Sequence, residues 1–171
     1  MQDNIYLVGL MGAGKTTVGR RLSKLLDLEF IDTDQLLEEK TGVTVSHIFE
    51  IEGEAGFRER ETRLLEEIHI PGGKVVSTGG GLVLSEKNRD LMRKSGHVIY
   101  LKASITVLWR RLKDCQNRPL LQTENPKARL EQLLHERDPI YMEAAESVVR
   151  VDSDSAHRTA MKILRMLNTK S

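Results

Sequence analysis

Short apolar runs alternate along the whole chain with longer stretches in which apolar residues recur every three or four positions. Runs of the first kind are typical of buried strands, and a period of about 3.6 residues is typical of amphipathic helices. The predicted strands cover residues 5–8, 29–31, 74–77, 98–101 and 148–151. The predicted helices cover residues 16–26, 33–40, 54–68, 85–94, 105–112, 126–145 and 156–167. This alternation predicts βαβ units, and therefore an α/β fold with a parallel sheet and helices on both of its faces.

Two connections carry more charge or glycine than a connector requires, and we expect function to lie there. Residues 43–63 form an extra helical insertion between the second and third predicted strands. Residues 114–125 read D-C-Q-N-R-P-L-L-Q-T-E-N, a polar composition that suits a mobile surface flap. A chain of 171 residues is long enough for one domain and too short for two ordinary ones, so residues 1–171 are expected to form a single domain.

Composition excludes several classes of function. Lys and Arg number 26 against 25 Asp and Glu, so no global field attracts nucleic acid or a membrane surface. Apolar runs are short and no charged-then-apolar leader is present, which favours a cytoplasmic protein. Cys115 is the only cysteine and the histidines lack metal-ligand spacing, so we expect neither an internal disulfide nor a zinc site. Balanced charge without a large apolar stripe suits a monomer.

Residues 9–16 read G-L-M-G-A-G-K-T, directly after the first predicted strand and before the first predicted helix. In this spacing the glycines let successive N–H groups and the helix N-terminus converge on phosphate oxygens. Lys15 then reaches the β and γ phosphates, and the Thr16 hydroxyl is an oxygen ligand for Mg²⁺. The alternative is a glycine-rich turn with a solvated lysine. We expect a nucleoside triphosphate to contact Gly12, Ala13, Gly14, Lys15, Thr16 and Thr17.

Two aspartates follow the second predicted strand, in the segment F-I-D-T-D. In an extended chain residues i and i+2 point the same way, so Asp32 and Asp34 are expected to face a common space at the carboxyl edge of the sheet, beside the phosphate loop. Asp32 is placed to hold Mg²⁺ through a water, and Asp34 can accept a proton from an attacking hydroxyl. The alternative is that Asp32 or Thr33 only caps the next helix.

Three consecutive glycines, residues 79–81, follow the third predicted strand at the same edge. Without side chains they expose bare N–H groups, which favours the rim of a substrate site. The alternative is a plain loop that uses glycine for its positive φ angles.

Several arginines are candidates for binding an anionic substrate. Arg58 and Glu61 are one helical turn apart, so the acid can fix the direction of the guanidinium, although spacing alone does not choose Arg58 over Arg60. Arg137 lies in a long helical stretch before a proline, and a planar guanidinium can bind a carboxylate through two parallel hydrogen bonds. Arg118, in the flap, can close over the β and γ phosphates. For any single arginine the alternative is a solvated side chain.

Together these motifs resemble the shikimate kinase family, small members of the nucleoside monophosphate kinase group of P-loop proteins. The resemblance covers essentially the whole chain, through G-x-x-G-x-G-K-T-T at 9–17, D-x-D at 32–34, G-E-x-x-F-R-x-x-E at 53–61, G-G-G at 79–81, R-P-L-L at 118–121 and E-R-x-P-x-Y at 136–141. It implies a three-layer P-loop kinase fold with a five-stranded parallel sheet of order 2-3-1-4-5. It also implies a substrate-binding insertion at about 33–63 and a lid at about 112–125.

The resemblance further implies a reaction: the ATP- and Mg²⁺-dependent phosphorylation of the 3-hydroxyl of shikimate, giving shikimate 3-phosphate and ADP, in aromatic amino acid biosynthesis. Carried over position by position, the resemblance implies a role for each site residue. Shikimate would be bound by Asp34 at its hydroxyls, where Asp34 also accepts the proton, by Arg58 and Arg137 at its carboxylate, and by Gly80 at its ring substituents, with Phe57 and Phe49 forming the pocket wall. For ATP, Lys15 and Arg118 would contact the phosphates, Thr16 and, through water, Asp32 would hold Mg²⁺, and Asp154 would contact the adenine.

Two rival interpretations remain. A gluconate-type or nucleoside monophosphate kinase shares the loop and the lid, but explains neither the two carboxylate-seeking arginines nor the three glycines. A nucleotide-binding switch without a small acceptor leaves Asp32 and Asp34 without a purpose, and the chain has no N-K-x-D guanine motif.

Overall fold

A five-stranded parallel sheet forms the centre of the computed structural model, which describes residues 3–70, 72–151 and 155–169. The strands are β1 (Asn4–Val8), β2 (Glu29–Asp32), β3 (Lys74–Ser77), β4 (Gly96–Lys102) and β5 (Ser147–Arg150). Their spatial order is β2-β3-β1-β4-β5, so the predicted order 2-3-1-4-5 is confirmed. All five predicted strands are present, with ends that differ by at most two residues.

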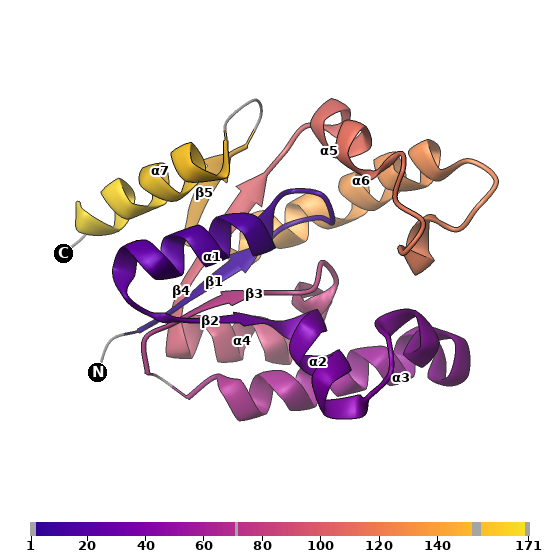
Figure 1. The fold of residues 1–171 in the computed structure, drawn as a ribbon, viewed down its shortest axis with the longest axis horizontal. Coiled ribbons are helices and arrows are strands. Elements are labelled where there is room, and N and C mark those ends of the chain that lie inside the picture. The colour runs from indigo at the N-terminus through magenta and orange to yellow at the C-terminus, as the bar shows by residue number, and fades with distance from the viewer. Residues whose placement is uncertain (1–2, 71, 152–154, 170–171) are drawn as a thin grey trace.

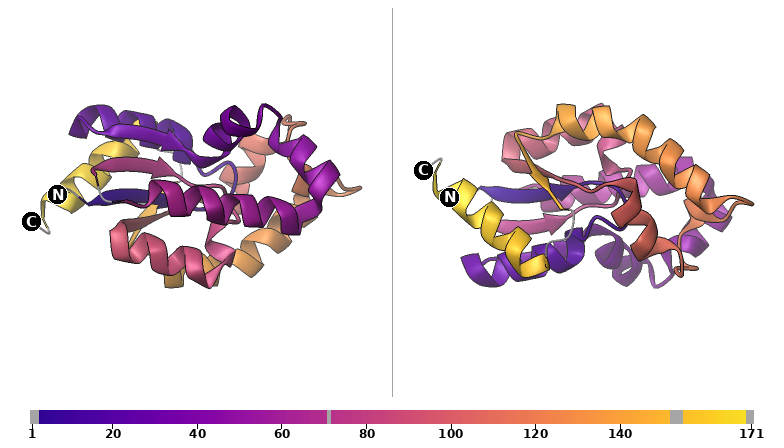
Figure 2. Two further views of the ribbon diagram at one scale, coloured as in Figure 1. Left: turned by 90° about the horizontal axis from the view of Figure 1, so that it is seen from below. Right: turned by 90° about the horizontal axis from the view of Figure 1, so that it is seen from above.

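Helices cover both faces of the sheet (Figures 1 and 2). The helices are α1 (Lys15–Leu26), α2 (Thr33–Thr41), α3 (Val45–Ile68), α4 (Glu86–Ser95), α5 (Ile105–Leu112), α6 (Pro126–Ala144) and α7 (Ala156–Asn168), with 3₁₀ turns η1 (Leu82–Leu84) and η2 (Pro119–Leu121). Helices α1 and α7 pack together on one face, and α3, α4 and α6 cover the other. Within the described residues, no helix is long and apolar enough to cross a membrane.

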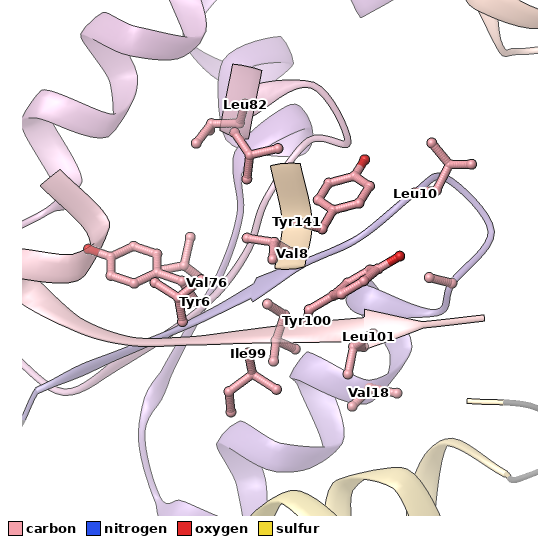
Figure 3. Close-up of a cluster of buried hydrophobic side chains, with 14 of the residues drawn as sticks. Tyr6, Val8, Leu10, Val18, Val76, Leu82, Ile99, Tyr100, Leu101 and Tyr141 are labelled. Carbon is pink, nitrogen blue, oxygen red and sulfur yellow. The ribbon is translucent and has the colours of Figure 1, made fainter. Parts of the chain in front are cut away.

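The core lies where the central strand is covered on both sides. All five residues of β1 are buried, as expected for an inner strand of a parallel sheet, and so is most of β4 beside it. Figure 3 shows part of this core, in which Tyr6 and Val8 of β1 lie near Ile99 and Tyr100 of β4. A buried central strand gives the loop that follows it a rigid base.

Helix α3 differs from the prediction, which began a helix at residue 54. It starts at Val45, and Gly53, with φ 70° and ψ −177°, breaks the helical path inside it. A residue with a side chain adopts that positive φ only with strain, so glycine permits the kink. The expected insertion thus consists of α2 and the first part of α3, and it projects at the same end of the molecule as the segment between α5 and α6 (Figure 1).

Candidate functional site

The loop between β1 and α1 has the backbone of a phosphate cradle. Gly9, Gly12 and Gly14 all have positive φ angles, which explains why glycine stands at each of these positions. Helix α1 begins directly after Gly14, so its free N–H groups open onto the loop. The Lys15 ammonium donates to the carbonyl oxygens of Gly9, at 2.6 Å, and Leu10, at 3.1 Å. The side chain of Lys15 therefore spans its own loop.

Burial controls the charge of this lysine. It lowers the pKa of Lys15 to about 8, although the nearby Asp34 carboxylate acts in the opposite direction. An anionic ligand stabilises the ammonium form and raises that pKa again. The loop thus offers a cation that has lost much of its hydration and gains most from a phosphate.

Asp32 performs two roles at once. One carboxylate oxygen accepts hydrogen bonds from the backbone N–H groups of Asp34 and Gln35, both at 3.1 Å, and so caps α2. The other accepts from the Thr16 hydroxyl at 2.5 Å. The capping alternative is therefore true, but it uses only one oxygen. Two oxygen ligands side by side at the phosphate loop fit the donor set that Mg²⁺ prefers.

Asp34 shares the same space for a different reason than the one predicted. The argument from an extended chain is wrong, because α2 already begins at Thr33 and Asp34 lies in its first turn. Both aspartates nevertheless line one cavity with the phosphate loop. Burial, followed by the negative charge of Asp32, raises the pKa of Asp34 above its ordinary value, against the opposing effect of Lys15. A raised pKa suits a carboxylate that accepts a proton near neutral pH.

The three glycines form a turn pressed between the phosphate loop and the insertion. The Thr78 hydroxyl donates to the Leu7 carbonyl at 3.0 Å, and the Gly79 N–H donates to the Thr33 hydroxyl at 2.9 Å. A Cβ at Gly79 would lie 2.5 Å from a carboxylate oxygen of Glu61, whereas one at Gly80 would have no neighbour closer than 3.6 Å. A side chain at 79 would therefore displace the carboxylates of Glu61 and Asp34, while the space beside Gly80 is open.

Arg58 reaches this turn from α3. It donates to Glu61 at 2.6 Å and to Glu54 at 3.2 Å, so the predicted hold by Glu61 is present. Its Nε is buried without a hydrogen-bond partner, and its guanidinium packs against Gly81. Arg60, the alternative that spacing left open, instead pairs with Glu52 on the outside of α3, where its side chain is 40% exposed.

Arg137 approaches the same turn from α6. It is only 4% exposed, and its Nη1 has no hydrogen-bond partner. Tyr141, one turn further along α6, donates from its hydroxyl to the Gly80 carbonyl at 2.5 Å. Charges on Arg58, Asp34 and Arg137 all act on the pKa of Glu61, so these groups form one electrostatic cluster. Two guanidinium groups, one half-buried and one buried, therefore lie near the glycine turn, and each has a buried nitrogen without a hydrogen-bond partner.

Phe57 and Phe49 lie behind Arg58. Phe57 is buried, and its ring centroid is 4.6 Å from that of Phe49. The Arg58 guanidinium lies over the Phe57 ring, 5.2 Å from its centroid. A cation over an aromatic face is favourable, so the ring supports the arginine.

Two adjoining cavities lie beside the phosphate loop, and the residues that line them include neither Arg58 nor Arg137. One of 270 Å³ lies over the phosphate loop and the glycine turn, and another of 490 Å³ lies between the insertion and the segment 117–119. Asp32, Asp34 and Arg118 line both cavities. Arg118 thus stands above the phosphate loop, as expected of a lid residue. We call the residues that line these two cavities, from the phosphate loop to Arg118, the rim.

Sequence reasoning missed Arg111 of α5. Its guanidinium donates to the Gly12 carbonyl at 2.9 Å and lines both the rim and a smaller cavity of 190 Å³ between α1 and α7. Asp154, the predicted adenine contact, lies outside the described residues. The residues lining the smaller cavity include Ala13, Thr17, Val151 and Thr159.

Comparisons with known proteins agree with one another. A family model described as shikimate kinase matches residues 11–168. A shikimate kinase of Nitrosospira multiformis is 50% identical over 168 residues, which cover 98% of this chain and 86% of that protein. One of Thioalkalivibrio sulfidiphilus is 51% identical over 163 residues, which cover 95% of this chain and 86% of that protein.

Solved structures give the same result at the level of the fold. A structure described as shikimate kinase from Acinetobacter baumannii in complex with shikimate has a TM-score of 0.97 and 45% identity, and covers 100% of this chain and 96% of that one. A shikimate kinase from Aquifex aeolicus has a TM-score of 0.85 and 33% identity, with 98% and 97% of the two chains covered.

Proposed function

The chain belongs to the shikimate kinase family, and we propose that its rim carries out the family's reaction with the residues described above. It is an enzyme that transfers the γ-phosphoryl group of ATP to the 3-hydroxyl of shikimate, in aromatic amino acid biosynthesis. Each step of this transfer falls to a particular group of the chain.

The phosphates of ATP bind along residues 12–17, with the Lys15 ammonium leaving its two carbonyl partners to contact the β and γ phosphates. Arg118 adds positive charge from the lid side. Thr16 and Asp32 would hold Mg²⁺, since their oxygens already lie 2.5 Å apart, and the bound cation would neutralise charge on the phosphates. We place the adenine in the 190 Å³ cavity, where the planar Arg111 guanidinium can stack on a base.

Shikimate occupies the space between the glycine turn and the insertion. Its carboxylate binds Arg58 and Arg137, and Gly80 leaves room for its ring. Asp34 orients the 3-hydroxyl and accepts its proton as the oxygen attacks the γ-phosphorus, a role that its raised pKa supports. Closure of the lid over both substrates excludes water, which would otherwise compete as the acceptor.

One observation carries the assignment of the acid-binding site. Arg58 and Arg137 approach the glycine turn from two different helices, and each keeps a buried guanidinium nitrogen without a hydrogen-bond partner. Buried donors without partners are costly, and a carboxylate that accepts from both removes that cost. Neither a nucleotide switch nor a kinase for an uncharged acceptor needs such a pair.

The experiment compares Arg58→Ala with Arg60→Ala, two residues apart on the same helix. We expect Arg58→Ala to raise the KM for shikimate at least about tenfold, as loss of a charge-assisted contact does, with the KM for ATP unchanged. Arg60→Ala removes only an exposed ion pair and should leave both values near those of the unmodified enzyme. ADP release with shikimate, gluconate and AMP in parallel fixes the acceptor.

Equal effects of the two variants would contradict the assignment of the carboxylate site, and ADP release with gluconate or AMP at the rate seen with shikimate would contradict the acceptor. We also propose that the enzyme is a monomer, because every group of the proposed site comes from one chain. Light scattering at assay concentration tests this.

A further inference from the structure

A cavity of 590 Å³ lies at the carboxyl ends of β4 and β5, against α6 and the start of α5. Its lining residues are Lys102, Ala103, Ser104, Ile105, Glu131, Leu134, His135, Asp138, Pro139 and Arg150. None of them lines the rim or the smaller cavity between α1 and α7. Its volume lies within the range of small-molecule sites, roughly 300 to 1,000 Å³, and the carboxyl edge of a parallel sheet is where such sites form. The reaction leaves this cavity without a role.

Two cations stand side by side in it. Lys102 and Arg150 are register partners on the neighbouring strands β4 and β5, and both line the cavity. Like charges in such positions repel each other unless an anion lies between them. Asp138 accepts from Lys102 at 3.0 Å, but Arg150 makes no hydrogen bond or ion pair with any residue that the structure describes. Among the residues that the structure describes, the exposed Arg150 guanidinium therefore has no partner.

The remaining polar groups set the balance. Helix α5 begins at Ile105 on the cavity wall, where the Ser104 hydroxyl accepts from the Val107 N–H at 3.3 Å, and the other N–H groups of the first turn add partial positive charge. Two carboxylates, Asp138 and Glu131, oppose this positive charge. Asp138 already accepts from Lys102 and from the Tyr100 hydroxyl, the latter at 2.7 Å, and Glu131 is exposed. Ser104 and His135 complete the polar lining, and the other lining residues, Ala103, Ile105, Leu134 and Pro139, are apolar.

From this arrangement we propose that the cavity is a second ligand site, which binds a small carboxylate with an apolar body, and that its occupant modulates the binding of shikimate. The carboxylate lies between Arg150 and Lys102 at the strand ends, and the apolar body lies against α6. The binding half of the proposal is independent of the proposed function, whereas the modulation half rests on it.

The route of modulation is a short chain of contacts. A carboxylate that attracts Lys102 weakens its bond to Asp138, which also holds the Tyr100 hydroxyl. The ring centroid of Tyr100 is 4.9 Å from that of Tyr141, and Figure 3 shows the two side chains together at the end of β4. Tyr141 in turn donates to the Gly80 carbonyl at the rim. Asp138 also directly follows Arg137, the proposed shikimate ligand, on α6.

The first experiment measures binding without using activity. The full chain, saturated with ADP and shikimate, is titrated with 3-phenylpropanoate and, as the neutral control, 3-phenylpropanamide, while methyl NMR signals of Ala103, Ile105 and Leu134 are followed. We expect the acid alone to shift them in a saturable way, and Arg150→Gln to weaken its binding about tenfold. Arg165→Gln, an exposed arginine on α7 outside the cavity, should bind like the unmodified protein.

Equal binding of the acid and the amide, an undiminished affinity in Arg150→Gln, or no saturable shift at millimolar probe overturns the site. A failure of the proposed function would appear separately, as loss of shikimate turnover without any change in these shifts.

The second experiment measures the KM for shikimate at saturating ATP, with and without 3-phenylpropanoate. We expect the acid to change the KM in the unmodified enzyme but not in Arg150→Gln. Tyr100→Phe, which keeps the ring and loses the bond to Asp138, should still bind the acid and lose the effect on KM. A change in KM that persists in Arg150→Gln would mean competition at the rim and would overturn the modulation, as would an unchanged KM in the unmodified enzyme.

Discussion

Replacement of Glu61 by glutamine tests the electrostatics of the proposed substrate site. Glu61 is only 2% exposed, and burial raises its pKa to about 7 from an ordinary 4.5, although its partner Arg58 acts in the opposite direction. Between these two pH values the native state holds a proton that the unfolded chain has released. The free energy of unfolding therefore falls as pH rises through this window, and the pKa difference corresponds to about 3 kcal/mol.

Glu61→Gln removes this titration and keeps an oxygen that accepts from Arg58. We expect its stability relative to the unmodified enzyme to increase by about 3 kcal/mol between about pH 5 and about pH 8. Urea unfolding across that range, without ligands, gives the difference directly. Groups outside the Glu61 cluster titrate alike in both proteins, so their contributions cancel.

Glu59→Gln is the matched control, because Glu59 is exposed on the same helix and pairs with Arg63. Its stability difference from the unmodified enzyme should not change with pH over this range. If Glu61→Gln gives an equally flat difference, Arg58 keeps Glu61 ionised throughout, and the reasoning from burial is refuted.

Three further variants test the proposed chemistry. Asp34→Asn should lower kcat by about a hundred- to ten-thousand-fold, as loss of a general base does, with ATP affinity by calorimetry nearly unchanged; near-normal turnover would remove Asp34 from the catalytic role. Lys15→Met should abolish measurable ATP binding in the same assay while raising the free energy of unfolding at pH 7, since burial of this ammonium opposes folding. Gly80→Ala should keep its stability in urea, because a Cβ there meets nothing closer than 3.6 Å, but should raise the KM for shikimate severalfold; an unchanged KM would place the ring elsewhere.

Local signals were enough for most of the fold. The predicted strand 74–77 has the same ends as β3, because a short apolar run between polar segments leaves little choice of where the strand begins and ends. The sequence predicted a helical insertion at 43–63 and a helix from residue 54, but not that α3 runs from Val45 through both, because Gly53 interrupts the helical path between its two parts. Residues of both anomalous connections line the 490 Å³ cavity.

Contacts between distant segments were beyond a reading of local pattern. Arg111 lies 99 residues from Gly12 in the chain, and on α5 it reads as one more solvated arginine of a basic last turn. The choice of Arg58 over Arg60 likewise depended on which side of α3 faces the glycine turn. Asp34 was singled out by an argument that fails: α2 begins at Thr33, as predicted, so Asp34 lies in a helix and not in an extended chain, and the first turn of that helix brings its carboxylate to the same cavity.

The carboxylate of Asp32 links the start of α1 to the start of α2. One of its oxygens accepts hydrogen bonds from the first turn of α2, and the other accepts from Thr16 at the N-terminus of α1. A cation or nucleotide that displaces Thr16 therefore also acts on α2, which begins the insertion proposed to bind shikimate. Binding of one substrate can therefore raise the affinity for the other through a single side chain, because Asp32 contacts both elements.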